Sequence, residues 1–283
     1  MRAAGTLRHG LTLPTGGPCA DPRFLLQLAE RAEAAGWDGV FVEDYVLFQG
    51  EPQAPTCDPW IALAGMAVRT ERIRLGTKVT PLARRRPWNV ARQAAAIDQL
   101  SGGRMILGAG LGDVGDHVIR DASLTHLGEE LDAERRAAML DEALAIIAGL
   151  WTGEPFSHDG PHFHVAEVTF LPRPVQQPRI PIWIGGGYPK PGPTRRAARW
   201  DGSMLYRAGG GDLDLADVRG IRAAAGDRPY DITVGATRSA DPEADAERLR
   251  ALEDAGATWT SQYVPVQDAA TMRRAVDRGP ILA

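Results

Sequence analysis

The chain has 283 residues, of which 44% are hydrophobic and 24% are charged, proportions that are ordinary for a soluble globular enzyme. A formal net charge of −4 provides no general basic field, so neither nucleic acid nor an anionic membrane is expected as a partner. Two cysteines occur far apart, at Cys19 and Cys57, and no apolar run reaches the length of a signal peptide or the ~20 residues of a membrane span. These features predict a cytoplasmic protein.

Short apolar runs alternate with helical patterns along the whole chain. In chain order, strands are expected at residues 9–13, 39–44, 73–79, 104–110, 181–186, 202–206, 231–236 and 257–264. Each is followed by a helix, expected at residues 24–36, 59–70, 87–100, 132–151, 194–200, 213–225, 243–255 and 269–278. Local signals support these positions, because Gly36 suits a helix C-terminus and Asp58 followed by Pro59 suits a helix N-terminus.

Short, continuous apolar strands are typical of parallel strands that are buried on both faces. Their alternation with helices predicts a parallel sheet, and eight repeats favour a closed (β/α)8 barrel, or TIM barrel, over an open doubly wound sheet. One irregular insertion, at about residues 152–180, falls between the fourth helix and the fifth strand. We therefore expect one domain that spans residues 1–283.

A glycine-rich stretch, GAGLGDVG at residues 108–115, follows the fourth strand and contains the pattern G-x-G-x-x-G. In a dinucleotide-binding fold this pattern lies in the first βαβ unit, opens a helix directly, and precedes a strand that ends in an acidic residue. None of these conditions is met, so a Rossmann domain is rejected. At the carboxyl end of a barrel strand, Gly108 and Gly110 instead allow a flat ring or ribityl chain to approach the backbone. Tight packing at a bend is the alternative reason for these glycines.

Several stretches resemble one known family. RTERIRLGTKVTPLARRRPWNVARQAAAIDQLSGGRMILGAGLG, at residues 69–112, is similar to the luciferase-like monooxygenases, the flavin- or deazaflavin-dependent barrels related to bacterial luciferase. LAERAEAAGWDGVFVEDY before it agrees as well, as do LDEALAIIAGLWTGEPFSHDGPHFHV and LPRPVQQPRIPIWIGGG after it, in the same order. The resemblance covers roughly residues 10–205 and identifies the chain as a member of a family that includes monooxygenases, dehydrogenases and reductases.

The resemblance implies a barrel that binds FMN, or alternatively the 5-deazaflavin coenzyme F420, across its carboxyl mouth. The segment Gly76-Thr77-Lys78 would pack against the cofactor ring, which makes Thr77 and Lys78 cofactor-binding candidates. Some members of the family have a non-proline cis peptide at this place.

Many relatives carry Asp-His at the end of the second strand, where the histidine serves in acid–base steps. This chain has Asp44 and Tyr45 there, and a tyrosine with a pKa near 10 is a poor base at neutral pH. Asp44 and Tyr45 are therefore catalytic candidates by position alone. The alternative is that Asp44 caps a turn and Tyr45 lines the pocket.

A second glycine-rich stretch, IGGGYPKPGPTRR at residues 184–196, is expected to form a loop between a strand and a helix. Backbone N–H groups at the end of a strand, with a helix N-terminus behind them, suit a flavin phosphate. The candidates are the glycines Gly185, Gly186 and Gly187, with a charge added by Arg195 or Arg196. A flexible connection is the alternative.

Arg86 ends a run of three arginines after the third strand and is a candidate to bind an anionic substrate or the acidic tail of a deazaflavin coenzyme. A solvated loop whose arginines pair with acidic groups is the alternative. Three histidines at residues 158, 162 and 164 lie in the insertion, in what the sequence predicts to be a hairpin. Histidines of metal-dependent barrel hydrolases would lie at strand ends, so no metal site is expected.

Together these features predict a flavin-dependent oxidoreductase, a monooxygenase by first expectation, that acts on a small organic substrate. With FMN, a separate flavin reductase would supply reduced cofactor, because no nicotinamide site is evident; with deazaflavin, hydride transfer would replace oxygenation. Two other functions are kept open, namely a flavin-binding paralogue without activity and a phosphate-binding isomerase or aldolase. Since relatives are often dimers, a homodimer is expected.

Overall fold

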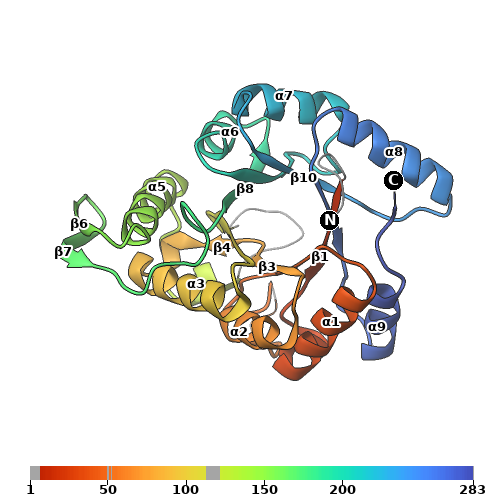
Figure 1. The fold of residues 1–283 in the computed structure, drawn as a ribbon, viewed down its shortest axis with the longest axis horizontal. Coiled ribbons are helices and arrows are strands. Elements are labelled where there is room, and N and C mark those ends of the chain that lie inside the picture. The colour runs from red at the N-terminus through yellow and green to blue at the C-terminus, as the bar shows by residue number, and fades with distance from the viewer. Residues whose placement is uncertain (1–6, 50, 52, 113–121, 283) are drawn as a thin grey trace.

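Eight parallel strands form a closed barrel that helices surround (Figure 1). The computed structural model describes residues 7–49, 51, 53–112 and 122–282. Neighbouring strands follow the order β3, β2, β1, β11, β10, β9, β8, β5, and β5 returns to pair with β3, so the predicted TIM barrel is confirmed. The barrel strands are β1 (Arg8–Leu13), β2 (Gly39–Val42), β3 (Arg74–Thr77), β5 (Met105–Gly110), β8 (Ile182–Tyr188), β9 (Gly202–Arg207), β10 (Asp231–Gly235) and β11 (Trp259–Tyr263).

The helices lie outside the barrel and cover its outer face (Figure 1). They are α1 (Pro22–Ala34), α2 (Pro59–Arg69), α3 (Pro87–Ser101), α5 (Ala133–Leu150), α6 (Pro191–Ala197), α7 (Leu215–Ala225), α8 (Pro242–Asp254) and α9 (Ala269–Asp277). The expected end signals are present: Asp58 accepts hydrogen bonds of 2.8 and 3.0 Å from the N–H groups of Trp60 and Ile61, and Gly36 follows α1 with a φ of +88°. No helix in this described part of the chain has the length and apolar character that a membrane crossing requires.

Four short elements were not predicted: the helix α4 (Ala122–His126), the two-residue strand β4 (Thr80–Pro81), and the 3-10 turns η1 (Gly17–Ala20) and η2 (Leu82–Arg84). Several strand ends also differ from expectation: β3 ends two residues early, at Thr77, and β11 begins two residues late, at Trp259. β2 ends two residues early, at Val42, whereas β8 continues to Tyr188 because it stays paired with β9 over its whole length.

The barrel interior is filled by a group of large side chains, which we term the aromatic plug: Phe41, Ile106, Trp183, Met204 and Trp259. The ring centroids of Trp183 and Trp259 are 5.3 Å apart, and that of Phe41 lies 5.5 and 6.0 Å from them. Such tilted and edge-to-face pairs each contribute about 0.5–1.5 kcal/mol beyond the burial of their area. The plug fills the barrel interior, so a binding site at the carboxyl end of the strands must lie between the plug and solvent.

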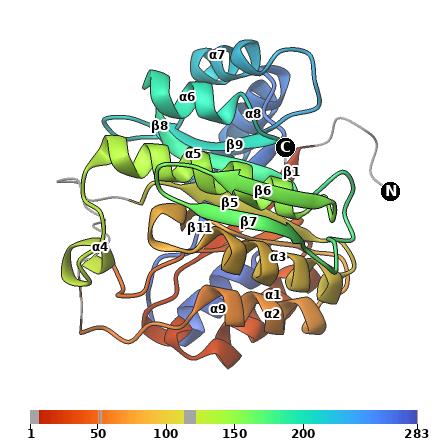
Figure 2. The same cartoon turned by 90° about the vertical axis from the view of Figure 1, so that its left-hand side faces the viewer.

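The insertion predicted at 152–180 contains an antiparallel hairpin of β6 (Pro155–Asp159) and β7 (His164–Thr169). The hairpin lies against α5, outside the barrel (Figure 2). Glu142 of α5 fastens it, because its carboxylate accepts bonds from the N–H of Phe163 at 2.7 Å, the N–H of His162 at 3.2 Å and the ring of His158 at 2.9 Å.

Candidate active site

The carboxyl mouth of the barrel is lined by a polar layer directly above the aromatic plug. Side chains of a strand alternate between its two faces, so a residue two positions after an inward-facing one also faces inward. Phe41 belongs to the plug and Glu43 lines the mouth; Trp259 and Ser261 have the same relation. Five chain segments thus deliver polar groups to one place: Thr12, Glu43, Lys78, Thr233 and Ser261.

These residues line a cavity of about 310 Å³. Met204 belongs both to the plug and to the cavity lining, so the plug is the floor of the cavity. Tyr206, Asp212 and Tyr263 lie on its outer side. A concave site at the carboxyl ends of barrel strands, with a few convergent polar groups, is the usual place for catalysis in this fold.

Glu43 is the most deeply enclosed acid of the cavity, with 7% of its surface exposed. Burial disfavours its charged form and raises its pKa to about 7, although a hydrogen bond with Gln49 and the charge of Lys78 oppose that rise. Its Oε2 atom is buried and has no hydrogen-bond partner among the residues that the structure describes. The cavity therefore contains an acid that changes its protonation state near neutral pH.

Lys78 reaches into the same cavity, and its Nζ donates a hydrogen bond to Oγ of Ser261. Ser261 in turn lies 2.9 Å from the hydroxyl of Thr12. Burial lowers the pKa of Lys78 to about 8, against the opposing charges of Glu43 and Asp212. Lys78 is thus an ammonium close to its own titration range, beside two carboxylates.

Asp212 belongs to the loop after β9 and covers one side of the cavity. A Cβ built on Gly235 would lie 1.9 Å from its Oδ1, so the glycine leaves the space that this carboxylate occupies. The preceding residues Gly209, Gly210 and Gly211 all have a positive φ, between 84° and 103°, which glycine adopts without strain. The loop conformation that brings Asp212 over the mouth thus depends on glycine.

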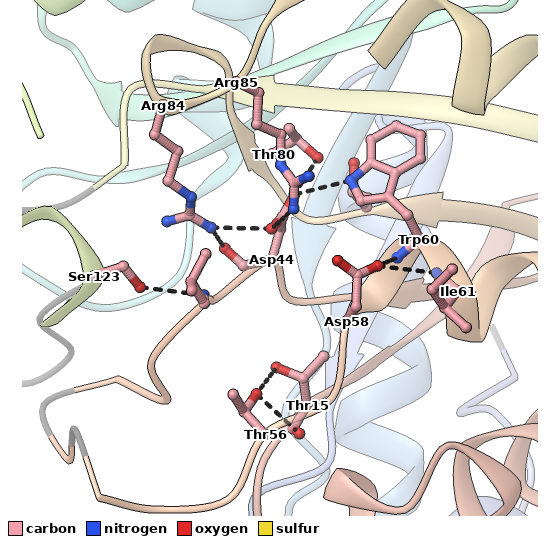
Figure 3. A network of polar contacts seen from close by, with 12 residues as sticks. Thr15, Asp44, Thr56, Asp58, Trp60, Ile61, Thr80, Arg84, Arg85 and Ser123 are labelled. Carbon is pink, nitrogen blue, oxygen red and sulfur yellow. Dashed lines mark hydrogen bonds and ion pairs between the residues drawn. The ribbon is translucent and has the colours of Figure 1, made fainter. Parts of the chain in front are cut away.

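The candidate acid Asp44 lies outside this cavity, in a buried network of ion pairs (Figure 3). Its side chain is fully buried, and Oδ1 pairs with Arg84 at 3.0 Å and with Arg85 at 2.7 Å. Its Oδ2 accepts hydrogen bonds from Trp60 at 3.1 Å and Thr80 at 2.8 Å. Burial by itself would raise the pKa of Asp44, but the two arginines and these hydrogen bonds hold it below its usual value. With all these bonds made, the carboxylate serves to fasten the segment after β2.

Tyr45 is half-buried and packs edge to face against Phe48, with ring centroids 6.0 Å apart. Its side chain is not among those that line the cavity. The expected catalytic pair of Asp44 and Tyr45 therefore lies beside the mouth, and neither residue borders the cavity at its centre.

The candidate cofactor residues Thr77, Gly108 and Gly110 make close contacts between β3, the segment after it and β5. The hydroxyl of Thr77 donates to the carbonyl oxygen of Gly108 at 2.8 Å, and a Cβ on Gly108 would lie 2.0 Å from the carbonyl oxygen of Thr77. The peptide bond between Lys78 and Val79 is cis. The Val79 side chain fills the space next to Gly110, where a Cβ would lie 2.6 Å from it. The packing alternative thus accounts for both glycines, and Lys78 is the member of this group that reaches the cavity.

The expected glycine loop at residues 184–196 is a strand over its first half. Gly185, Gly186 and Gly187 belong to β8 and pair with residues 204–206 of β9, so the expectation of a loop at these positions is wrong. A Cβ on Gly185 would lie 2.8 Å from Val79, which again makes room for that side chain. Arg195 is exposed on α6, while Arg196 is buried and pairs with Asp141 at 2.7 Å.

Arg86 precedes α3 as an exposed residue and does not border the cavity. In the hairpin, the ring of His158 hydrogen-bonds Glu142 and the ring of His164 hydrogen-bonds Asp159. Over the described residues, no three histidine, cysteine, aspartate or glutamate side chains are grouped closely enough to hold a metal ion. The stretch 113–121, which includes the last glycine of G-x-G-x-x-G, lies outside the described residues.

Comparison with known proteins decides the family, because residues 5–278 match the sequence profile of the luciferase-like monooxygenases. The chain belongs to the luciferase-like monooxygenase family. It is accordingly an oxidoreductase, in agreement with the interpretation of the sequence.

Among relatives of this luciferase-like protein, the F420-dependent glucose-6-phosphate dehydrogenase of Beutenbergia cavernae is 33% identical over 275 residues, which are 92% of this chain and 77% of that one. Matches with two further enzymes of that name span about half of their lengths, 50% and 49%. The coenzyme F420-dependent tetrahydromethanopterin reductase of Methanopyrus kandleri has the same fold, with a TM-score of 0.75 at 17% identity over 98% of this chain and 99% of that one. The oxygenating constituent of 3,6-diketocamphane monooxygenase from Pseudomonas putida, in complex with FMN, also shares the fold, with a TM-score of 0.67 at 17% identity over 96% of both chains.

Sequence reasoning missed Glu43, Thr12, Thr233, Ser261 and Asp212. For most of them a signal was present in this luciferase-like chain, namely strand alternation. An aromatic residue in the short apolar run of β2 fills the barrel, and the polar residue two positions later must then face the mouth. That rule selects Glu43 over Asp44. Asp212 has no such signal, because a long loop carries it.

Proposed function

We propose that the protein is a deazaflavin-dependent oxidoreductase that moves hydride between coenzyme F420 and a small hydroxyl or carbonyl compound at the carboxyl mouth of the barrel. The observation that carries this proposal is the match over 92% of the chain with a relative named as an F420-dependent dehydrogenase. The cavity that holds Glu43 and Lys78 supplies the chemistry that such a reaction requires of the protein.

The lining residues fit a deazaflavin ring by their hydrogen-bonding groups. Two buried oxygens that border the cavity, Oε2 of Glu43 and Oγ1 of Thr233, have no partner in the described part of the chain. Buried polar atoms are nearly always paired, so such atoms at a cavity indicate that a bound molecule completes them. Lys78 and Ser261 add donors to face the carbonyl oxygens of a flavin-type ring.

When bound, the deazaflavin supplies a two-electron hydride acceptor or donor and excludes oxygen activation. The chain itself contributes side chains that enclose the site and a group, Glu43, that can exchange a proton. The aromatic plug closes the site from below, and the loop that carries Asp212 covers it from the side. Both limit water around the reacting atoms.

The substrate is proposed to be uncharged. Among the described residues that line the cavity, two carboxylates, Glu43 and Asp212, accompany a single cation, Lys78. Arg86 and Arg195 are exposed and do not line the cavity, and a phosphate dianion needs several cationic or backbone donors. The lining therefore favours an alcohol or a carbonyl compound over a phosphorylated sugar, although the relatives are named for glucose 6-phosphate.

The test is anaerobic mixing of the protein and F420 with glucose 6-phosphate, glucose and a series of secondary alcohols, while the visible absorbance of the oxidised cofactor is recorded. Bleaching with a neutral alcohol supports the proposal. Bleaching with glucose 6-phosphate, and with none of the neutral compounds, contradicts the proposed substrate class but agrees with F420 as the cofactor. Binding of F420 without any bleaching supports a paralogue without activity, and FMN-dependent oxygen uptake with a flavin reductase restores the monooxygenase alternative.

A further inference from the structure

Glu43 is a buried carboxylate whose side chain bonds Gln49 but keeps one oxygen, Oε2, without a partner among the described residues. No ion pair like those of Asp44 holds it there. A buried polar atom without a partner costs about 1–3 kcal/mol, and Oε2 of Glu43 is such an atom at the edge of the cavity. Glu43 has 7% of its surface exposed and lines the cavity.

The groups that face Glu43 come from four elements. The charge of Lys78 after β3 attracts Glu43, and Asp212 beyond β9 interacts with the charge of Lys78 as well. Tyr263 of β11 and Cys19 of η1 both have pKa values raised by burial and by the charge of Glu43. Of these groups only Lys78 is cationic, so its charge, together with the hydrogen bond from Gln49, opposes the rise in the pKa of Glu43 that burial causes.

The other acid–base candidates do not meet these conditions. Asp44 has its carboxylate bonded to Arg84 and Arg85, and Tyr45 does not border the cavity. Tyr263 titrates well above neutral pH, since burial raises its pKa. Among the described carboxylates, Glu43 is the one that combines access to the cavity with a buried, unpartnered oxygen.

We propose that Glu43 is the residue that accepts the proton of the substrate hydroxyl, and that Lys78 acts as a positioning residue which holds its charge and orientation. This inference rests on the proposed function. In the oxidation direction the O–H bond breaks and its proton moves to Oε2 of Glu43, while the C–H electron pair leaves as hydride to the deazaflavin and the carbon–oxygen double bond forms. In the reduction direction, protonated Glu43 returns the proton to the carbonyl oxygen.

The pKa of about 7 for Glu43 agrees with this task, because a base works best when its pKa lies near the pH of operation. Glu43 thereby supplies the acid–base group that Tyr45, two residues later on the same segment, does not provide. The neighbouring Ser261 fixes the Nζ of Lys78, and Thr12 fixes Ser261, which keeps the pair in place.

The experiment compares wild-type protein with Glu43→Gln and with a matched control, Glu167→Gln, at an exposed position of the hairpin. For Glu43→Gln we expect kcat to fall by about 10²–10⁴-fold, the usual contribution of a general base. F420 binding, followed by fluorescence, should remain saturable, and circular dichroism should show an unchanged fold. Glu167→Gln should match the wild type throughout.

A second readout does not depend on turnover. Carbon-13 NMR of labelled glutamate carboxyl groups should show one group that titrates near pH 7 and is lost in Glu43→Gln. Lys78→Gln should move that titration, and the acid limb of the kcat profile, to higher pH, because the stabilising positive charge is gone. A purely structural role of Lys78 would leave both unchanged.

Two results would overturn the inference: Glu43→Gln that keeps wild-type kcat, or a Glu43 that titrates near 4.5 in the folded protein. If Glu43→Gln does not fold, Glu43→Asp is used in its place. For Glu43→Asp we expect a reduced kcat and a pH profile of kcat that keeps its acid limb. Failure of the wild type itself to bind F420 would reject the proposed function instead, so the two failures are distinguishable.

Discussion

Two adjacent carboxylates, those of Glu43 and Asp44, have opposite surroundings because successive side chains leave a strand on opposite faces. Glu43 points into the mouth cavity and has an unpartnered oxygen. Asp44 points between the strands and helices, where Arg84 and Arg85 compensate its charge (Figure 3). One acid therefore remains available for chemistry, while the other stabilises the segment that carries it.

Replacement of Asp44 by asparagine should strongly destabilise the fold. The change leaves two guanidinium groups without their buried carboxylate, and breaking a buried ion pair in this way costs about 3–5 kcal/mol. Urea unfolding followed by circular dichroism measures the effect. The matched control is Asp277→Asn, which breaks an ion pair with Arg31 whose two side chains are 40% and 44% exposed, and a much smaller change is expected there. Equal losses in the two variants would contradict the structural role of Asp44.

The folding stability should also depend on pH through Glu43. Its pKa is raised from 4.5 to about 7 on folding, so between these values the folded protein binds a proton that the unfolded chain has lost. The contribution of Glu43 is therefore fully present below pH 4.5, and stability decreases as the pH rises through 7, by up to about 3 kcal/mol. In Glu43→Gln this decrease should disappear from the free energy of unfolding measured in urea between pH 4.5 and 8. An unchanged slope in the variant would show that another group is responsible.

At the scale of elements, glycines within the barrel strands leave room for neighbouring groups. Gly39 and Gly202 have the rings of Trp259 and Trp183 where a Cβ would be, and Gly108 has the backbone of β3 there. The strands can close around large rings because other strands have no side chain at the same level.

Gly108→Ala should therefore reduce stability without any cofactor present. Its Cβ would lie 2.0 Å from the backbone oxygen of Thr77, and forced rearrangement of a packed core costs typically about 1–3 kcal/mol. The control is Gly192→Ala in α6, where no atom lies within 4 Å of the added Cβ and alanine favours the helix. A Gly108→Ala protein with wild-type unfolding free energy but weakened F420 binding would reverse this interpretation and make the glycine a cofactor contact.

Glu142 of α5 makes polar contacts that fasten the hairpin of β6 and β7. Glu142→Ala removes the acceptor of the N–H groups of His162 and Phe163. Amide hydrogen exchange at these two residues should accelerate at least tenfold, while exchange in β9 and β10 stays unchanged. Acceleration throughout the barrel would mean instead that the hairpin supports the whole fold.

At the scale of the whole molecule, the eight repeats were enough to predict the barrel, because alternation of buried strands and helices allows few arrangements. The site was harder to predict. Lys78, a predicted cofactor contact, lines the cavity, but Glu43 was passed over for its neighbour because the inward face of β2 had not been worked out from Phe41. The strand extension through Gly187 and the position of Asp212 depend on contacts between distant segments, which no local pattern contains.

The central claim, that the mouth of this barrel binds a deazaflavin, is tested most directly by fluorescence titration of the purified protein with F420 and, separately, with FMN. The account predicts saturable F420 binding at least tenfold tighter than that of FMN, and weaker F420 binding when Thr233 or Ser261 at the mouth is replaced by valine or alanine. Tighter binding of FMN, or no binding of F420 below about 100 μM, near −5.5 kcal/mol, would contradict it.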